Sequence, residues 1–156
     1  MTQGFNFDEM SKGDLVKELE SLYCSKSDII KHHSICAPHF RSMIKNRNQE
    51  HFMVLYLDKN KKIIEKKVVF LGTLNRSLVH PRETFHSAVV NNCPFIVIGH
   101  NHPSGNIQPS LEDIEMTRKL EKGGQILGVK VLDHVIITDT GHYSFKANGK
   151  ISTNEV

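Results

Sequence analysis

The stretch GHNHPSGNIQPSLED, residues 99–113, joins a run of apolar residues to a segment with helical spacing. The apolar run, PFIVIGH (94–100), is continuous, which is typical of a strand buried on both faces of a sheet. The segment that follows, SLEDIEMTRKLEKGG (110–124), predicts a helix that begins at an N-cap on Ser110 and ends at the Gly-Gly pair 123–124. A buried strand, a tight turn and a helix in this order indicate an α/β fold.

The flanking sequence supplies the other elements of this fold. Alternation and turn residues predict a hairpin upstream, then a helix with Pro81 in its first turn, and two further strands downstream. Because the sheet begins with a hairpin and continues with alternating helices and strands, we expect a mixed sheet with helices on both faces. The segments are HFMVLYLD (51–58), KIIEKKVVFLG (62–72), HPRETFHSAVVNN (80–92), VKVLDHVIITD (129–139) and GHYSF (141–145).

The first 46 residues are polar and predict a short helical N-terminal segment. Its second part, DIIKHHSICAPHFRSMIKNR (28–47), has helical spacing that Pro38 should interrupt. We therefore divide the chain into this segment (1–46), one α/β domain (47–147) and a flexible C-terminal tail (148–156).

Composition places the chain among ordinary globular proteins. It has 156 residues, 38% of them hydrophobic, and a net charge of +3, far from the strongly basic character of a dedicated DNA-binding domain. The lysine-rich stretch 59–67 is better explained as the charged edge of the hairpin. Three cysteines without a Cys-x-x-Cys pair favour free thiols, and the lack of a signal-like start predicts a cytoplasmic protein.

The connecting stretch also carries residues that can bind a metal. His100 and His102 are two apart in extended backbone, so both imidazoles face one side, and Asp113 on the first helical turn can return towards them. Two histidines and a carboxylate form a catalytic zinc set that leaves a fourth position for water. A capping box between Ser110 and Asp113 would explain the same residues without a metal. Asp113 can hardly cap and bind a metal with the same oxygen.

The pattern His100-x-His102-Pro103, six residues, then Ser110-x-x-Asp113 resembles the JAMM motif of MPN-domain metalloproteases. Over residues 48–146 the chain resembles the RadC family, a bacterial branch of that fold. The resemblance implies a three-layer MPN fold, similar in outline to cytidine deaminases. It also implies one Zn²⁺ per chain, bound by the two histidines and the aspartate. Ser110 would stabilise an oxyanion, and a glutamate outside the loop would activate the zinc-bound water.

Two glutamates compete for that last role. Glu50 directly precedes the first strand, which is the position that the JAMM pattern gives to the base. Glu83 lies on the predicted helix 80–92, away from its apolar stripe, and could instead oppose the helix dipole. We favour Glu50.

Four more residues have weaker assignments. His134 alternates within a buried strand and is better explained as a core histidine than as a ligand. Asn101, Ser104 and Gly105 could form the wall of the site.

The leading hypothesis is a zinc-dependent hydrolase that cleaves a peptide or isopeptide bond in a protein or peptide substrate. The alternative is a RadC-like, DNA-repair-associated protein that binds nucleic acid or protein, with a structural or vestigial zinc. The N-terminal segment shows no convincing Gly-containing hairpin of the helix-hairpin-helix type, which weakens the nucleic-acid hypothesis. A deaminase is not supported either, because its later Pro-Cys-x-x-Cys motif is missing.

Overall fold

The computed structural model of the protein describes residues 11–16, 28–72 and 79–152. Residues 12–16 are helical, and the rest of the first part of the predicted helical N-terminal segment, residues 1–10 and 17–27, lies outside the described residues. The elements are α2 (His33–Met43), β1 (His51–Leu57), β2 (Ile63–Leu71), α3 (Pro81–Val90), β3 (Phe95–Asn101), α4 (Leu111–Leu127), β4 (Lys130–Ile137) and β5 (His142–Ser144).

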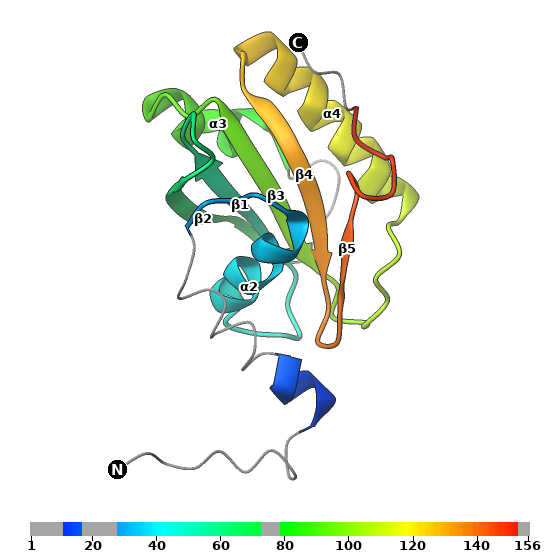
Figure 1. The fold of residues 1–156 in the computed structure, drawn as a ribbon. Coiled ribbons are helices and arrows are strands. Elements are labelled where there is room, and N and C mark those ends of the chain that lie inside the picture. Colours follow the sequence, from blue (N-terminus) through cyan, green and yellow to red (C-terminus); the bar gives the residue numbers. More distant parts are fainter. Residues whose placement is uncertain (1–10, 17–27, 73–78, 153–156) are drawn as a thin grey trace, which may run out of the picture.

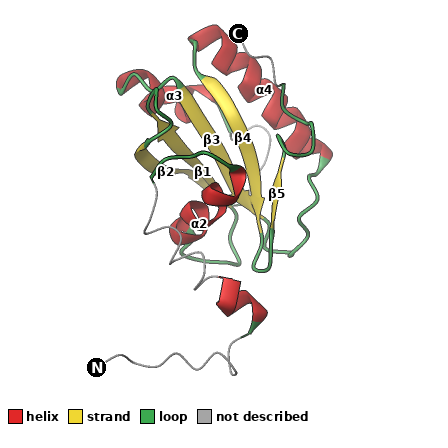
Figure 2. Ribbon diagram, in the orientation of Figure 1, coloured by secondary structure: helices red, strands yellow, loops and turns green. Residues whose placement is uncertain are grey.

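The strands form one mixed sheet, as predicted. Its order is β2-β1-β3-β4-β5, with β3 and β4 parallel and every other neighbouring pair antiparallel (Figure 2). The β1–β2 hairpin is confirmed, and β2 lies at the edge of the sheet. Because β3 and β4 run in parallel, their carboxyl ends meet at one edge, where the 99–113 stretch begins.

Helices cover both faces of the sheet, which gives the three-layer fold that the sequence predicts (Figure 1). α2 packs on one face through Phe40, whose ring lies directly over Gly99. A Cβ on Gly99 would lie 2.6 Å from that ring, so the close approach of α2 requires glycine here. α3 and α4 pack on the opposite face.

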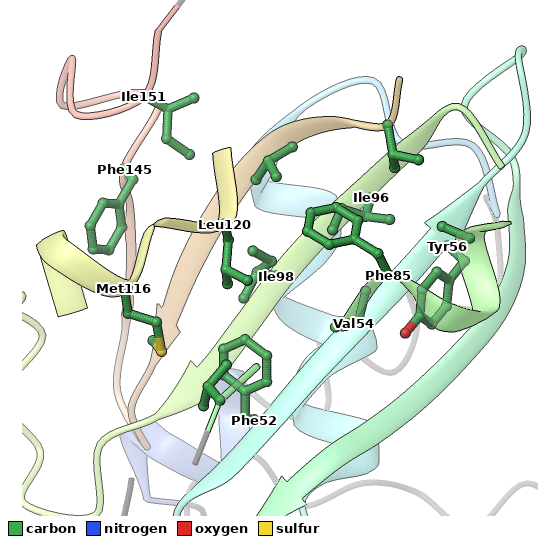
Figure 3. Close-up of a cluster of buried hydrophobic side chains, with 14 of the residues drawn as sticks. Phe52, Val54, Tyr56, Phe85, Ile96, Ile98, Met116, Leu120, Phe145 and Ile151 are labelled. Carbon is green, nitrogen blue, oxygen red and sulfur yellow. The ribbon is translucent and has the colours of Figure 1, made fainter. Parts of the chain in front are cut away.

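The larger core lies between the sheet and these two helices (Figure 3). Alternate residues of β1 and β3 point into it, including Phe52, Val54, Ile96 and Ile98, and Phe85 and Leu120 meet them from the helices. Along β3 the next residue on this face is His100. The alternation that buries the isoleucines therefore also directs the His100 side chain towards α4.

Two predicted helix boundaries were wrong, for the same reason. Pro38 lies inside α2, because the buried face of that helix outweighs the backbone hydrogen bond that proline removes. Gly123 and Gly124 lie inside α4, which ends instead at Gly128 in the left-handed region. A Cβ on Gly124 would lie 2.2 Å from the Val129 carbonyl oxygen, so this glycine permits close packing rather than a stop.

The division into 1–46, 47–147 and 148–156 stays a prediction. Two observations bear on it: α2 contributes Cys36, Ala37 and Phe40 to the core of the sheet, and Ile151 is buried in the core on the other side. Among the described residues, no helix is both long enough and apolar enough to cross a membrane.

Candidate metal centre

Two histidines meet at the end of β3. His100 is fully buried and His102 half-buried, and their Nε2 atoms are 2.9 Å apart. The backbone N–H of His102 donates to the carbonyl of Ile137 at 2.9 Å, so the pairing with β4 continues one residue beyond β3. Extended backbone through this point turns both imidazoles to the same side, as their spacing predicts.

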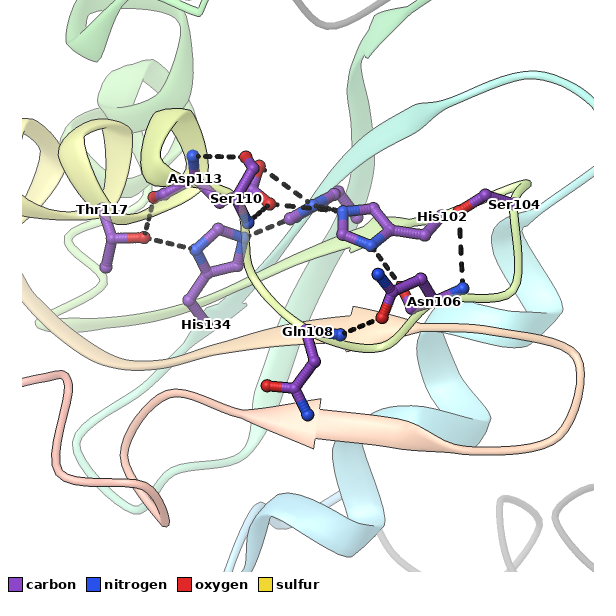
Figure 4. Close-up of polar contacts among 9 residues, drawn as sticks. His102, Ser104, Asn106, Gln108, Ser110, Asp113, Thr117 and His134 are labelled. Atoms are coloured by element: carbon purple, nitrogen blue, oxygen red, sulfur yellow. Dashed lines mark hydrogen bonds and ion pairs between the residues drawn. The ribbon is translucent and has the colours of Figure 1, made fainter.

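The loop after β3 returns Asp113 to these rings. Gly105, at φ +83°, donates its N–H to the His102 carbonyl and closes a tight turn. α4 then begins with Asp113 in its first turn, buried against the histidines (Figure 4). Its Oδ1 lies 3.3 Å from His100 Nε2 and its Oδ2 lies 3.3 Å from His102 Nε2. One ligand atom from each residue falls within 4.8 Å of the others, a grouping that could hold a metal ion.

Asp113 also forms the capping box, with one of its two oxygens. Its Oδ2 accepts the Ser110 N–H at 2.9 Å, and Ser110 Oγ accepts the Asp113 N–H at 3.0 Å. Oδ1 takes no part in the cap and faces His100. The two explanations that the sequence left open are therefore compatible, because different oxygens of one carboxylate serve them.

The tautomer of His102 is fixed by a backbone carbonyl. Its Nδ1 lies 2.6 Å from the carbonyl oxygen of Asn106 (Figure 4). A carbonyl can only accept, so Nδ1 donates, and the neutral ring presents its lone pair at Nε2. The loop 103–109 therefore orients a candidate metal-binding nitrogen and also returns the chain to the start of α4.

Two residues behind His100 also contact the centre. His134 Nε2 lies 2.7 Å from His100 Nδ1, and His134 Nδ1 lies 2.6 Å from Thr117 Oγ1. His134 is fully buried, as predicted, but it packs against a candidate ligand rather than in purely apolar surroundings. Thr117 was not predicted from the sequence, although its position four residues after Asp113 places both on one face of α4.

The pKa values in the centre reflect closely spaced acceptors. Burial alone would raise the pKa of Asp113, but its close contacts with the His100 and His102 imidazoles outweigh it and hold that pKa well below its ordinary value. Burial opposes protonation of His102, yet Asp113 and the Asn106 carbonyl, which could both accept from a protonated ring, raise its pKa. The cluster therefore attracts positive charge. Two imidazole nitrogens and a carboxylate oxygen match the ligand chemistry of zinc, so the residues fit such an ion.

Glu50 and Ser110 line the cavity onto which the centre opens. This cavity has a volume of about 850 Å³ and is also lined by His102, Ser104 and Asp113. The charge of Glu50 contributes to the raised pKa of His102, so the carboxylate is electrostatically coupled to the centre.

Asn101 fixes the backbone on either side of Glu50. It lies on the face of β3 opposite His100, and its side chain is buried. Its Oδ1 accepts the N–H of His51 at 2.6 Å, and its Nδ2 donates to the carbonyl of Gln49 at 3.0 Å. Asn101 was predicted as a possible residue of the site wall, and its bonds to the backbone beside Glu50 were not predicted. Asn101 and Gly105 line a smaller neighbouring cavity of about 130 Å³.

Glu83 lies apart from these residues. It occupies the first turn of α3, where it accepts a hydrogen bond from Arg82 at 2.8 Å and remains 47% exposed. That bond lowers the pKa of Glu83. It is not among the described residues that line either cavity.

The chain is similar to a known protein family and to several of its curated members. The profile of the family described as RadC-like JAB domain matches residues 30–150. A UPF0758 protein of Bacillus licheniformis is 40% identical over 136 residues, covering 87% of this chain and 61% of the relative. One from Methanococcoides burtonii is 47% identical over 120 residues (77% and 51%), and one from Methanosarcina acetivorans is 42% identical over 134 (86% and 56%).

This chain thus spans between half and about three fifths of the length of the curated relatives it matches. The family match covers most of the chain, including every residue of the metal centre. The chain belongs to the RadC family and carries its RadC-like JAB domain.

Proposed function

We propose that the protein is a zinc-dependent hydrolase of peptide or isopeptide bonds. One observation carries the proposal: His100, His102 and Asp113 converge beside a cavity that Glu50 and Ser110 also line. Three protein ligands are the number found in catalytic zinc sites, whereas structural sites have four. A bound zinc ion would act as a Lewis acid towards the scissile carbonyl and supply a nucleophile from water at neutral pH.

The chain's own residues then divide the proton transfers. Glu50 takes a proton from the attacking water and gives it to the leaving amine, since a carboxylate at the cavity wall can act in both steps. The Ser110 oxygen already accepts the Asp113 N–H, so its hydroxyl hydrogen can be donated to the developing oxyanion. Asn101 holds the backbone around Glu50 and keeps the base in place.

The charge of the cavity supports a protein or peptide substrate. Its lining includes the carboxylates of Glu50, Glu112 and Asp113, and no lysine or arginine among the described residues. Arg41 and Arg47 line the smaller cavity, where Arg41 donates to the carbonyls of Thr138 and Gly141. Such a lining disfavours a polyanionic phosphodiester and suits a neutral or basic peptide segment.

The lysines of the β1–β2 turn lie away from this cavity. Lys59, Lys61 and Lys62 follow the end of β1 at Leu57, whereas Phe52, near the other end of β1, pairs with His100. Five residue steps of strand, about 17 Å, separate these two ends. The other two lysines of the hairpin pair with the middle of β1 and lie closer to Phe52. Nucleic acid bound to the turn would therefore not lie at the metal centre, and a gel-shift titration against salt would test for such binding.

The first experiment is metal analysis of the purified protein and of the His100→Ala/His102→Ala variant by plasma mass spectrometry. We expect about one zinc per chain, lost in the variant. A panel of peptide and isopeptide substrates follows, with Glu50→Gln expected to keep zinc and lose turnover, and Glu83→Gln as the matched control that keeps both. No metal uptake by the wild type, or full turnover by Glu50→Gln, would contradict the proposal.

A further inference from the structure

We infer that His134, oriented by Thr117, is a positioning residue that holds His100 in the tautomer able to bind a metal. The inference rests on the proposed function of the metal centre. Neither residue is one of the three candidate ligands, and His134 reaches the centre only through His100. A chain of three hydrogen bonds leads from the carbonyl of Asp113 to Nδ1 of His100.

The carbonyl of Asp113 sets the direction of the first bond. Thr117 Oγ1 lies 2.7 Å from this oxygen, and a carbonyl only accepts, so the hydroxyl hydrogen of Thr117 is donated there. A hydroxyl has one hydrogen, and its oxygen must therefore accept the second bond, from His134 Nδ1 at 2.6 Å. The reverse assignment would leave two acceptor oxygens 2.7 Å apart with no hydrogen between them.

The tautomer of His134 sets the direction of its hydrogen bond with His100. Neutral His134 with its hydrogen on Nδ1 has a lone pair on Nε2, which accepts from His100 Nδ1 at 2.7 Å. Neutral His100 must then carry its lone pair on Nε2, the atom that faces Asp113 Oδ1 at 3.3 Å and His102 Nε2 at 2.9 Å. The other tautomer of His134 would put a hydrogen on His100 Nε2 and block the ligand atom.

The ring of His134 is held in place by aromatic packing. It stacks on Phe145 with centroids 4.5 Å apart and an interplanar angle of 11°, and it meets Phe52 edge-on at 6.5 Å. Its complete burial disfavours the charged form of the ring. The hydrogen bonds from Asp113 through Thr117 and His134 to His100, which we call the relay, therefore involve a neutral His134. The relay also begins on the backbone of Asp113, so the same residue that supplies a carboxylate sets the tautomer of His100.

Two pairs of variants test this role through zinc affinity, measured by competition with a chromophoric chelator. His134→Leu and Thr117→Val remove the hydrogen-bonding groups at similar volume, and we expect each to weaken Zn²⁺ binding about 10- to 100-fold. His134→Gln and Thr117→Ser can still accept from one side and donate to the other, and should bind within a few-fold of wild type. Equal affinity of the folded Leu and Val variants and the wild type would overturn the inference.

Nitrogen-15 NMR of histidine-labelled protein reads the tautomer directly. We expect the His134 hydrogen on Nδ1 with and without Zn²⁺, and a shift of that equilibrium in Thr117→Val. A hydrogen on Nε2 of His134 would overturn the relay. If the wild type took up no zinc, the proposed function would fail. The tautomer of His134 in the metal-free protein would still show whether Thr117 and His134 orient His100. If His134→Leu did not fold, the Thr117 pair would decide it.

Discussion

Asp113 and Asp133 are both buried carboxylates, yet their surroundings differ in one respect. Around Asp133 every contact supplies a hydrogen. The N–H groups of His134 and Lys146 donate to Oδ1 at 2.7 and 2.9 Å, and the Ser144 hydroxyl donates to Oδ2. Around Asp113 the capping N–H reaches only Oδ2, and the remaining neighbours are the Nε2 atoms of His100 and His102, which carry lone pairs in the tautomers inferred above.

This difference separates a structural carboxylate from a candidate metal ligand. Asp133 ties β4 to the segment after β5, and its raised pKa follows from burial, opposed by these bonds. Asp113 has a pKa held well below its ordinary value, despite burial, by the two histidines. Acceptors that converge without hydrogens between them need a cation, whereas acceptors saturated by backbone and hydroxyl donors do not.

The largest expected effect is on zinc affinity in the matched variants Asp113→Asn and Asp133→Asn. An amide at 113 can still accept the capping N–H but replaces the anionic ligand oxygen, and loss of one ligand should weaken binding on the order of 100- to 1000-fold. The amide at 133 can keep its backbone acceptor, so affinity should remain within about threefold of wild type. Competition with a chelator measures both affinities. Equal losses of zinc affinity in the two variants would contradict the assignment of a ligand role to Asp113 and a structural role to Asp133.

Stability should respond in the opposite order when each residue becomes alanine in metal-free protein. Asp133→Ala leaves buried N–H groups of His134 and Lys146 without an acceptor and should lower the free energy of unfolding by about 3 kcal/mol. Asp113→Ala removes only the acceptor of the Ser110 N–H from the capping box, worth about 1 kcal/mol, because the N-cap Ser110 remains. Urea denaturation at pH 8 compares them, and a larger loss at 113 would contradict the structural role of 133.

The dependence of zinc affinity on pH also distinguishes Asp113 from Asp133. The pKa of His102 is raised from 6.5, so below that raised value zinc must displace a proton, and affinity should fall about tenfold per pH unit. Above it the affinity should level off. In metal-free protein, the stability from the protonated His102–Asp113 pair is fully present below the unfolded pKa and lost as pH rises through the folded one. Asp133→Asn should leave the dependence of zinc affinity on pH unchanged. A shift in the pH midpoint of this variant would show that Asp133 is coupled to the metal centre.

The smallest expected effect concerns the hydroxyl beside Asp133. Ser144→Ala removes one donor from Oδ2 and leaves the two backbone bonds to Oδ1, so the free energy of unfolding should fall by about 1 kcal/mol. Zinc affinity should not change. Thermal unfolding and metal titration of the same sample check both expectations, and a change in affinity without a change in stability would be inconsistent with the structural assignment.

Features that depend on nearby residues could be predicted from the sequence. The hairpin, the strand at 94–100, and the spacing of His100, His102 and Asp113 follow from periodicity and turn chemistry over a few residues. The motif also located Ser110 at the helix cap, because a capping box spans only four positions. For these residues the backbone conformation alone fixes which way a side chain points.

Tertiary structure decided the rest. Pro38, Gly123 and Gly124 remain helical because packing against the sheet and between α3 and α4 outweighs local preference. His134 reaches His100 across 34 positions of sequence, and Asn101 reaches Gln49 across 52, only because of the strand order and register of the sheet. The sequence thus determined which residues could bind a metal. A contact between distant segments decided which nitrogen of His100 carries the lone pair towards the centre, because a tautomer depends on the hydrogen-bond partner that the fold supplies.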